Sequence, residues 1–303
     1  MDKSYIEKII NLRGNIGKKW LNNLPQLIKN FERKWEIKVK SPFPLSYNYV
    51  APAIMNNGES VVLKISFPNN NEFEAETEAL KFYNGIGAIK LIKESKEENV
   101  LLLEKAQPGI RLREIKSDEE QVSIASNVIK RLHKKIPDSY PFKFPTLADW
   151  SKIFERYKEK YSLNLGPIPK KIFENGESIF NELLNDKKEM VLLHGDLHTD
   201  NILSSENEWV IIDPKGVIGE SEFELGAYLR NPYYDLPKNS NYKEIEINRI
   251  VQFAEEFNFD KKRILRWAYA SAVISLLWFL EDENYIKDIY LKNAELLDNI
   301  KDI

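Results

Sequence analysis

The hydrophobic pattern of the chain changes its period between residues 36 and 105, and this change limits the folds that the chain can adopt. Apolar residues alternate in EIKVK, dominate VVLKISF and run almost without interruption through NVLLLEKA, as is typical of strands. Residues 71–83 keep a helical period, with acidic side chains in the first turns. With a weaker strand near residues 88–93, the order is β-β-β-α-β-β. We therefore expect a small antiparallel sheet with one helix packed on it.

The remainder of the chain has mostly helical spacing. Residues 1–35 are predicted to be helical, and Pro25 is expected to begin a new helix, because proline is favoured in the first turn. One β segment is predicted further along, with short strands at 190–193, 201–203 and 209–212. The other predicted elements are helices at 118–135, 146–161, 168–186, 222–229, 243–256, 260–280 and 283–301. The sequence thus predicts an α+β fold.

A turn separates the β-rich part from the helical part. Gln107, Pro108 and Gly109 follow the last strand, and such residues form turns at boundaries between elements. We therefore predict two lobes, an N-terminal lobe at residues 1–105 and a helical C-terminal lobe at residues 106–303.

Charge and composition exclude several classes of protein. The 303 residues include 44 basic and 47 acidic side chains, intermixed, for a net charge of −3. This distribution lacks the basic surface that nucleic acid requires, and it accommodates a cationic or neutral partner more easily than a polyanion. The chain has no cysteine, which excludes disulfides and cysteine zinc sites and agrees with a reducing compartment.

Neither the N-terminus nor the longest apolar run resembles a membrane segment. The N-terminal residues MDKSYIEKII lack the apolar core of a signal peptide. The longest apolar run, residues 268–280, is too short to span a bilayer and is bounded by Arg266 and Glu281. We expect a cytoplasmic protein with no membrane partner, in which this run is a buried helix.

The chemistry concentrates in HGDLHTDN at residues 194–201 and IIDPKG at residues 211–216. Transfer of a phosphoryl group needs a carboxylate that receives or orients the acceptor hydroxyl, and oxygen ligands that hold Mg²⁺ against the phosphates. Asp196, Asn201 after four intervening residues, and Asp213 at the end of an apolar strand supply these groups in the order of a kinase catalytic loop. We predict Asp196 as the catalytic residue and Asn201 and Asp213 as Mg²⁺ ligands.

These motifs resemble the aminoglycoside phosphotransferase family, and within it the streptomycin 6-phosphotransferase and hydroxyurea phosphotransferase branch. WLNNLPQL, SYNYVAPA, LGAYLRNP and ASAVISLLWFLED extend the resemblance over most of the chain. The resemblance implies a bilobal, protein-kinase-like fold, with ATP and Mg²⁺ as cofactors. It also implies a nucleotide-binding N-terminal lobe, and a C-terminal lobe that holds the catalytic loop and the site for a small-molecule hydroxyl acceptor.

The resemblance also assigns residues of the N-terminal lobe to the nucleotide. Lys64, in VVLKISF, resembles the strand lysine that contacts nucleotide phosphates. Its partner is expected to be a glutamate of the following helix, with Glu76 favoured by the pattern and Glu74 and Glu78 left open.

Two further segments resemble parts of a nucleotide site. The segment LEKA resembles the hinge, where backbone groups of Glu104 and Ala106 would bind adenine. Ser46 belongs to a segment that resembles the loop over the phosphates, although this loop has no glycine.

The acceptor is less well defined by the sequence. Acidic residues of the family's C-terminal lobe bind cationic aminocyclitols, and Glu281 and Asp282 follow the long apolar helix at a matching position. Lys215, two residues after Asp213, is a candidate for contact with the γ-phosphate. Arg230, in LRNP, either contacts substrate or phosphate or holds its loop through a salt bridge.

Three functions agree with this pattern. The first is an aminoglycoside kinase of the streptomycin type, which would confer antibiotic resistance. The second is a metabolite kinase of the same fold, acting on an amino alcohol or a sugar. The third is a nucleotide-binding pseudokinase, against which the presence of all three catalytic-loop residues argues. The sequence leaves the acceptor, the modified hydroxyl, the choice of ATP or GTP and the oligomeric state open.

Overall fold

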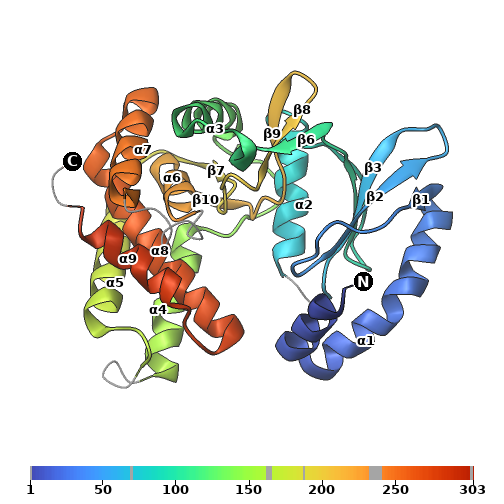
Figure 1. Cartoon of the computed structure of the whole chain (residues 1–303), viewed down its shortest axis with the longest axis horizontal. Helices are drawn as coiled ribbons and strands as arrows, with labels where there is room; N and C mark the ends of the chain where they lie inside the picture. The colour runs from blue at the N-terminus through green and yellow to red at the C-terminus, as the bar shows by residue number, and fades with distance from the viewer. Residues whose placement is uncertain (1, 69–70, 162–165, 187, 232–240, 301–302) are drawn as a thin grey trace. The chain divides into compact units, whose positions relative to one another are not determined.

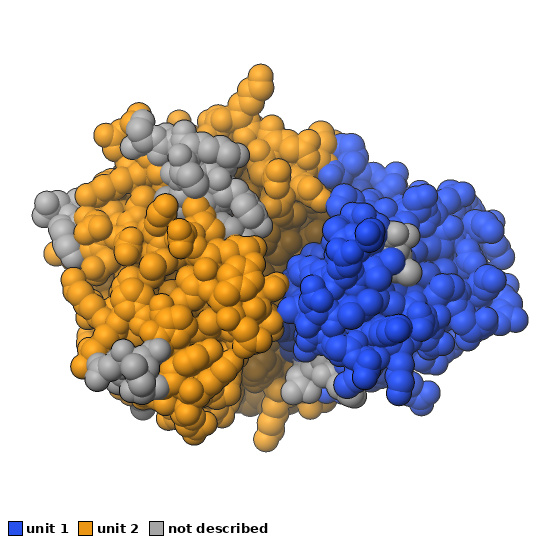
Figure 2. Space-filling model, turned by 60° about the horizontal axis from the view of Figure 1, so that its bottom comes forward, with its two compact units in different colours: residues 1–109 blue, residues 110–303 orange. Residues whose placement is uncertain are grey.

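The computed structural model describes residues 2–68, 71–161, 166–186, 188–231, 241–300 and 303. Within it the chain forms two compact units, residues 1–109 and 110–303 (Figure 2). The predicted lobe boundary at residues 105/106 lies close to this division. The functions assigned to the two lobes remain predictions.

The first unit is built on an antiparallel sheet of five strands in the order β1-β2-β3-β5-β4 (Figure 1). Two helices accompany the sheet, and the order β-β-β-α-β-β is the predicted one. The elements are α1 (Lys3–Trp35), β1 (Ile37–Val39), β2 (Tyr49–Met55), β3 (Ser60–Ile65), α2 (Asn71–Tyr83), β4 (Leu91–Ser95) and β5 (Val100–Glu104).

The long helix α1 covers the sheet and closes the core of the first unit. Its buried side chains, including Leu24 and Phe31, share one apolar cluster with Leu63 and Ile65 of β3. The prediction that Pro25 begins a new helix is wrong, because Pro25 lies inside α1 and the chain bends at Gly14 instead. A proline removes one backbone donor without ending a helix whose apolar face is held by tertiary packing.

The second unit is helical, with two small sheets. The sheet β10-β7 is antiparallel, and the other has the order β6-β8-β9. Strands β6 and β10 were not predicted; the rest follows the predicted order. The elements are β6 (Pro108–Arg111), the 3₁₀-helix η1 (Leu112–Glu114), α3 (Asp118–Leu132), α4 (Leu147–Lys160), α5 (Lys170–Asn185), β7 (Met190–Leu193), β8 (Ile202–Ser205), β9 (Glu208–Ile211), β10 (Val217–Glu220), α6 (Ser221–Leu229), α7 (Tyr242–Phe257), α8 (Lys261–Glu283) and α9 (Asp288–Asp298).

Helix α8 forms the centre of the second unit and packs against α4, α5, α6, α7 and α9. Among the helices described, it is long and apolar enough to cross a membrane by length and composition alone, but 72% of its apolar window is buried. A helix that is apolar all round and buried in this way is a core helix. Residues 268–280 are therefore part of a buried helix, as predicted.

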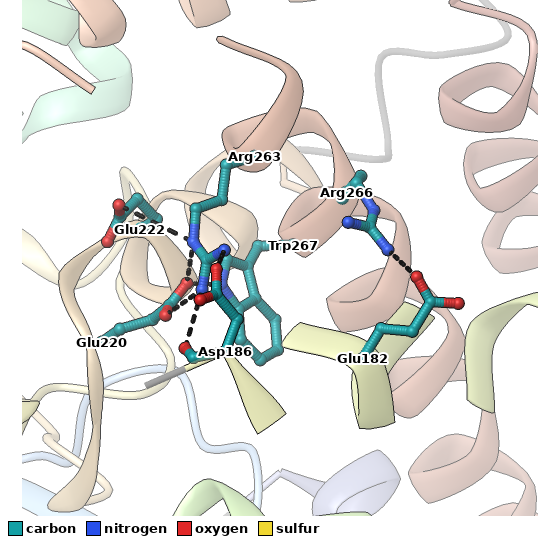
Figure 3. A network of polar contacts seen from close by, with 7 residues as sticks. All are labelled: Glu182, Asp186, Glu220, Glu222, Arg263, Arg266 and Trp267. Carbon is teal, nitrogen blue, oxygen red and sulfur yellow. Dashed lines mark hydrogen bonds and ion pairs between the residues drawn. The ribbon is translucent and has the colours of Figure 1, made fainter. Parts of the chain in front are cut away.

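A polar network fixes the first turns of α8 (Figure 3). Arg263 donates to both carboxylate oxygens of Glu220, at 2.8 and 2.5 Å, and to Asp186 at 2.5 Å. The indole N–H of Trp267 donates to the same Glu220, whose side chain is buried. A buried carboxylate needs such compensation, since an unpaired charge would be strongly destabilising. The network joins α8 to the end of β10, where α6 begins.

Candidate active site

The catalytic-loop motif occupies the connection between β7 and β8. Strand β7 is paired with β10 and ends at Leu193, so residues 194–201 leave the sheet as a loop. Leu197 and Thr199 are buried and anchor this loop, whereas the side chain of Asp196 is 33% exposed. The loop therefore presents one partly accessible carboxylate on a fixed backbone.

The backbone of this loop is held by the buried carboxylate of Glu224 in α6. Its two oxygens accept from the backbone N–H groups of His194, at 2.6 Å, and Gly195, at 2.9 Å. Burial alone would raise the pKa of Glu224, but contact with His133 and the nearby polar groups hold that pKa below its ordinary value. Glu224 thus has a structural role, since it holds the backbone of the catalytic loop.

The ring of His194 links the loop to the end of β9. Its Nε2–H donates to the carbonyl oxygen of Ile212 at 2.8 Å, and its Nδ1 accepts from the backbone N–H of Asp196 at 3.1 Å. These two contacts require the proton on Nε2. His194 therefore sets the distance between the loop that carries Asp196 and the turn that carries Asp213.

Arg230 forms a salt bridge with Asp196. Its Nη2 lies 2.5 Å from Oδ1 of Asp196, and the arginine side chain is almost completely buried. Burial raises the pKa of Asp196, but the charge of Arg230, with smaller contributions from His198 and Lys215, lowers that pKa below its ordinary value. Asp196 is thus a carboxylate that stays ionised, which suits it to orient a hydroxyl.

Asn201 and Asp213 lie at the same end of the β8–β9 hairpin. Ile202 pairs with Ile211, and the N–H of Ile212 donates to the carbonyl oxygen of Asn201 at 3.0 Å. The side-chain N–H₂ of Asn201 donates to the carbonyl of Asp196 at 3.0 Å, which leaves its amide oxygen as a candidate ligand. Asp213 has a left-handed conformation, with φ of +63°, and its carboxylate is exposed.

This donor set fits Mg²⁺. Mg²⁺ takes few protein ligands, usually hard oxygens, and completes its shell with water and substrate phosphates. One amide oxygen and one carboxylate, on neighbouring strand ends, meet that description. Within the described ranges no group of three or more histidine, aspartate or glutamate side chains could hold a metal by itself. The residues therefore fit a cation that arrives with a nucleotide.

Lys64 and Glu76 form the ion pair expected in the first unit. The Nζ of Lys64 lies 2.6 Å from Oε1 of Glu76, and both side chains are buried. Of the two alternatives, Glu78 pairs with Lys81 at 2.9 Å and Glu74 is exposed on α2. The geometry thus selects one glutamate from the three, while the contact of Lys64 with a nucleotide stays a prediction.

The candidate hinge follows β5. The backbone N–H of Glu104 donates to Lys90 at 2.9 Å, and the carboxylate of Glu104 accepts from the N–H of Lys90 at 3.0 Å. Ala106 is buried, and its backbone N–H makes no hydrogen bond with any described part of the chain. Glu104 is therefore tied to the connection before β4, and Ala106 retains a donor that a ligand could use.

Ser46 lies in the connection between β1 and β2, with an exposed side chain. The hydroxyl of Tyr5 in α1 donates to the carbonyl of Tyr47 at 3.2 Å, and Lys8 lies over the Tyr47 ring at 3.8 Å. Helix α1 therefore holds this connection, and its role as a loop over the phosphates stays a prediction.

The candidate acceptor residues lie in two places in the second unit. Lys215 follows the metal turn, and its backbone N–H donates to the carbonyl of His194 at 2.7 Å. Glu281 and Asp282 are exposed at the end of α8, and Glu281 accepts from Arg156 of α4 at 2.8 and 3.1 Å. The structure therefore brings Arg230 and Lys215 to Asp196, and provides Glu281 with a guanidinium partner from its own chain.

Three residues beside this site were not singled out from the sequence. Trp150 of α4 lies against Gly195, Arg156 binds Glu281, and Asn293 of α9 donates to the carbonyl of Arg230 at 3.2 Å. Each acts across more than 40 residues of chain, so local spacing contains no signal for it. The only hint is compositional, since α4 and α9 each place a polar or aromatic side chain within an apolar face.

The fold is of the protein-kinase-like class, and the arrangement of Asp196, Asn201 and Asp213 agrees with a phosphotransferase. The amicoumacin kinase hAmiN, solved in complex with AMP-PNP, Ca²⁺ and Ami, superimposes with a TM-score of 0.62 and 14% identity, over 91% of this chain and 92% of that one. This similarity establishes the α+β, protein-kinase-like fold, as predicted.

The family follows from the sequence. A model of the aminoglycoside/hydroxyurea antibiotic resistance kinases matches residues 42–283, and the chain belongs to that family. Streptomycin 6-kinase of Streptomyces glaucescens is 24% identical over 89% of this chain and 87% of its own length. Hydroxyurea phosphotransferase of Kitasatospora aureofaciens is 23% identical over 91% of this chain and 79% of its own. The protein is thus a phosphotransferase of this type, in the branch that its motifs predicted.

Proposed function

We propose that the protein transfers the γ-phosphoryl group of ATP to a hydroxyl of a small cationic molecule, in the manner of a streptomycin kinase, in the cytoplasm and with Mg²⁺. The observation that carries this proposal is the Asp196 carboxylate. It is partly accessible, fixed to a rigid loop and kept ionised by Arg230. The relatives that phosphorylate streptomycin support an aminoglycoside acceptor.

Asp196 orients the acceptor in this proposal. One of its oxygens is occupied by Arg230, which leaves the other for the hydroxyl of the acceptor. Phosphoryl transfer proceeds through a loose transition state, so positioning contributes more than early removal of the proton. A carboxylate with a lowered pKa is a weak base, so Asp196 is better suited to position the acceptor hydroxyl than to hold its proton. The proton of the hydroxyl therefore passes to the Asp196 carboxylate late, as the new bond to phosphorus forms and the bond from phosphorus to ADP breaks.

In this proposal, cationic groups and Mg²⁺ balance the charge on the phosphates. Lys64, held by Glu76, provides a cation for the nucleotide, and Asn201 and Asp213 provide the oxygen ligands for Mg²⁺. When bound, Mg²⁺ would neutralise charge on the β- and γ-phosphates. Lys215 lies close enough to Asp196 to lower its pKa, and we assign its charge to the γ-phosphate.

A coupled ADP-release assay tests this proposal. Purified protein with Mg-ATP is offered streptomycin, other aminoglycosides, hydroxyurea, choline and simple sugars. Turnover with streptomycin or another aminoglycoside supports the resistance-kinase function. Turnover with choline or a sugar alone moves the function to a metabolite kinase with the same catalytic residues. Binding of Mg-ATP without transfer to any acceptor would indicate a pseudokinase.

Two variants separate the assigned roles. Asp196→Ala should abolish transfer and leave the affinity for Mg-ATP nearly unchanged, because Asp196 faces the acceptor. Asp213→Ala should weaken Mg-ATP binding as well, because it removes the only carboxylate of the proposed metal site. Titration of each variant with Mg-ATP by calorimetry measures this difference. An equal loss of binding in both variants contradicts the assignment.

A further inference from the structure

Two tryptophans lie beside the catalytic loop without a role in the transfer step. Trp150 stands in the first turn of α4, which begins at a capping box formed by Thr146 and Asp149. Thr146 bridges to Ile218 of β10, and the N–H of Ile218 donates to Pro145 at 2.8 Å. Since β10 pairs with β7, the start of α4 is fixed to the sheet from which the catalytic loop leaves.

The indole of Trp150 touches the loop immediately before Asp196. A Cβ built on Gly195 would lie 2.7 Å from Cη2 of Trp150, closer than side chains approach, and Gly195 has a φ of +82°. Only glycine fits between this indole and the neighbouring Val217 and Lys215. The indole edge is therefore one residue away from the carboxylate that orients the acceptor.

Trp278 of α8 extends this aromatic surface. Its ring centroid lies 4.9 Å from that of Trp150, with an interplanar angle of 86°, and Phe223 supports Trp150 from α6 at 5.9 Å. Edge-to-face geometry of this kind is favourable and holds both rings in defined orientations. The two indoles form a rigid wall that extends from the catalytic loop to the last turns of α8.

The indole N–H groups of both rings have no hydrogen-bond acceptor among the residues that the structure describes. Buried indole N–H groups usually find an acceptor, as Trp267 does at Glu220. In contrast, the N–H groups of Trp150 and Trp278 make no hydrogen bond to any of the residues described, and both side chains are partly exposed. Two partly exposed indoles with unused donors, close to the catalytic loop, are typical of a surface that binds a ligand.

Negative charge continues this surface along α8. Glu281 and Asp282 are three and four residues after Trp278, so all three lie on the same face of the helix. Glu281 is bound by Arg156, but both side chains of that pair are substantially exposed, 39% and 50%, and such pairs contribute little stability. A cationic group of a ligand can therefore replace the guanidinium of Arg156.

We propose that Trp150 and Trp278 form the wall of the acceptor subsite, against which the saturated ring of a cationic acceptor packs. The apolar face of the ring lies on the indoles, its hydroxyl reaches Asp196, and its guanidinium or ammonium group lies toward Glu281 and Asp282. Indole faces attract such cations. This inference rests on the proposed kinase function and adds two residues that would select the acceptor.

The test compares Trp278→Ala and Trp278→Phe with the wild-type protein, with streptomycin as the probe. Because a cation on an indole face contributes about 1–2 kcal/mol, Trp278→Ala should raise both the KM and the dissociation constant for streptomycin about tenfold. Trp278→Phe should recover most of this loss, and the KM for Mg-ATP should change less than about twofold in both variants. Trp209→Phe, in β9, is the matched control.

The dissociation constant, measured by calorimetry, separates this inference from the proposed function. Wild-type binding that Trp278→Ala weakens supports the wall even if no phosphate is transferred. An unchanged dissociation constant in Trp278→Ala, with a wild-type melting temperature, overturns it. The inference is also overturned if the wild-type protein binds no cationic ring compound but phosphorylates another hydroxyl compound, a result that leaves the kinase function intact.

Discussion

The carboxylate of Glu224 should contribute more to the catalytic loop than any other side chain outside it, and Glu224→Gln tests this. The two oxygens of Glu224 accept from the N–H groups of His194 and Gly195 at 2.6 and 2.9 Å, and the side chain is 0% exposed. In glutamine one of these oxygens becomes an N–H₂ group that faces an N–H donor. The variant therefore loses one charge-assisted bond and leaves one buried donor without an acceptor.

The expected cost follows from these two losses. A hydrogen bond to a charged group contributes about 1.5–3 kcal/mol, and a buried unsatisfied donor costs about 1–3 kcal/mol. Since both estimates describe the loss of the same hydrogen bond, they do not add in full. We therefore expect the free energy of unfolding to fall by about 2–4 kcal/mol. For a unit of this size, about 1 kcal/mol lowers the melting temperature by roughly 2–4 °C. A loop displaced by about 1 Å would also lower kcat about 100-fold.

The loss of stability in Glu224→Gln should depend on pH. The pKa of Glu224 is lowered in the folded protein, so its stabilising contribution is present above the ordinary value of 4.5 and is lost as the pH falls through the lower, folded value. The difference in melting temperature between Glu224→Gln and the wild type should thus be full at pH 7 and shrink in acid. Below the folded pKa both proteins carry a neutral side chain.

Thermal unfolding from pH 3 to pH 8, followed by circular dichroism, measures this difference. Glu255→Gln is the matched control, because Glu255 is an exposed glutamate of α7 with no recorded partner among the described residues. A melting temperature for Glu224→Gln within about 1 °C of the control at pH 7 would refute the reasoning. A difference that persists unchanged at pH 3 would refute the role of the charge.

Three other predictions concern buried polar groups. Lys64→Met and Glu76→Gln should each cost about 3–5 kcal/mol, and the double variant should be more stable than either in urea unfolding, because breaking a buried ion pair costs more than replacing both of its members. Asn293→Ala should move the acidic limb of the kcat–pH profile to higher pH, since Arg230 loses its anchor and the pKa of Asp196 rises. Glu246→Gln should stabilise the protein at pH 8 by roughly 3 kcal/mol in thermal unfolding, since burial raises the pKa of Glu246 to about 7.

The sign of the last prediction follows from proton binding. Between about pH 4.5 and pH 7 the folded protein binds a proton at Glu246 that the unfolded chain has released, so the stability of the wild type falls as the pH rises through this window. Glu246→Gln should remove that fall and leave stability below pH 4.5 almost unchanged. Equal stability of the two proteins at pH 8 would show that the ion pair with Arg249 compensates fully for burial.

The sequence predicted those parts of the site whose residues lie close together along the chain. Asn201 and Asp213 are close because one short hairpin joins them, and the strands at 201–203 and 209–212 were predicted from an apolar pattern. To identify the partner of Lys64, one must know the rotation of α2 about its own axis. The sequence does not give this rotation, so three glutamates remained candidates. The contact at 2.6 Å resolves that choice for Glu76.

The parts that could not be predicted depend on contacts between distant segments. Arg230 was left with two roles, and its partner Asp196 is 34 residues away. Glu281 was interpreted from its position at a helix end, but its partner Arg156 is 125 residues away. Spacing along a chain cannot show which charges meet, because tertiary packing brings these helices together.

Several of these contacts between distant segments are made by helix α6 and the residues at its two ends. At its start Glu220 binds Arg263 and Trp267 of α8, in its middle Glu224 holds the backbone of the catalytic loop, and at its end Arg230 holds the catalytic carboxylate. The helix can do this because it is buried on every side and very close to α8.

That closeness depends on one residue. A Cβ on Gly226 would lie 3.0 Å from the carbonyl oxygen of Trp267 and from the Cβ of Ser271, so any larger residue would push α6 away from α8. Such a shift would move the backbone of the loop and the partner of Asp196 together, because Glu224 and Arg230 are on the same short helix. Helix α6 therefore has a positional role in the site. It sets the position of the acid relative to the loop, which the catalytic motif alone cannot do.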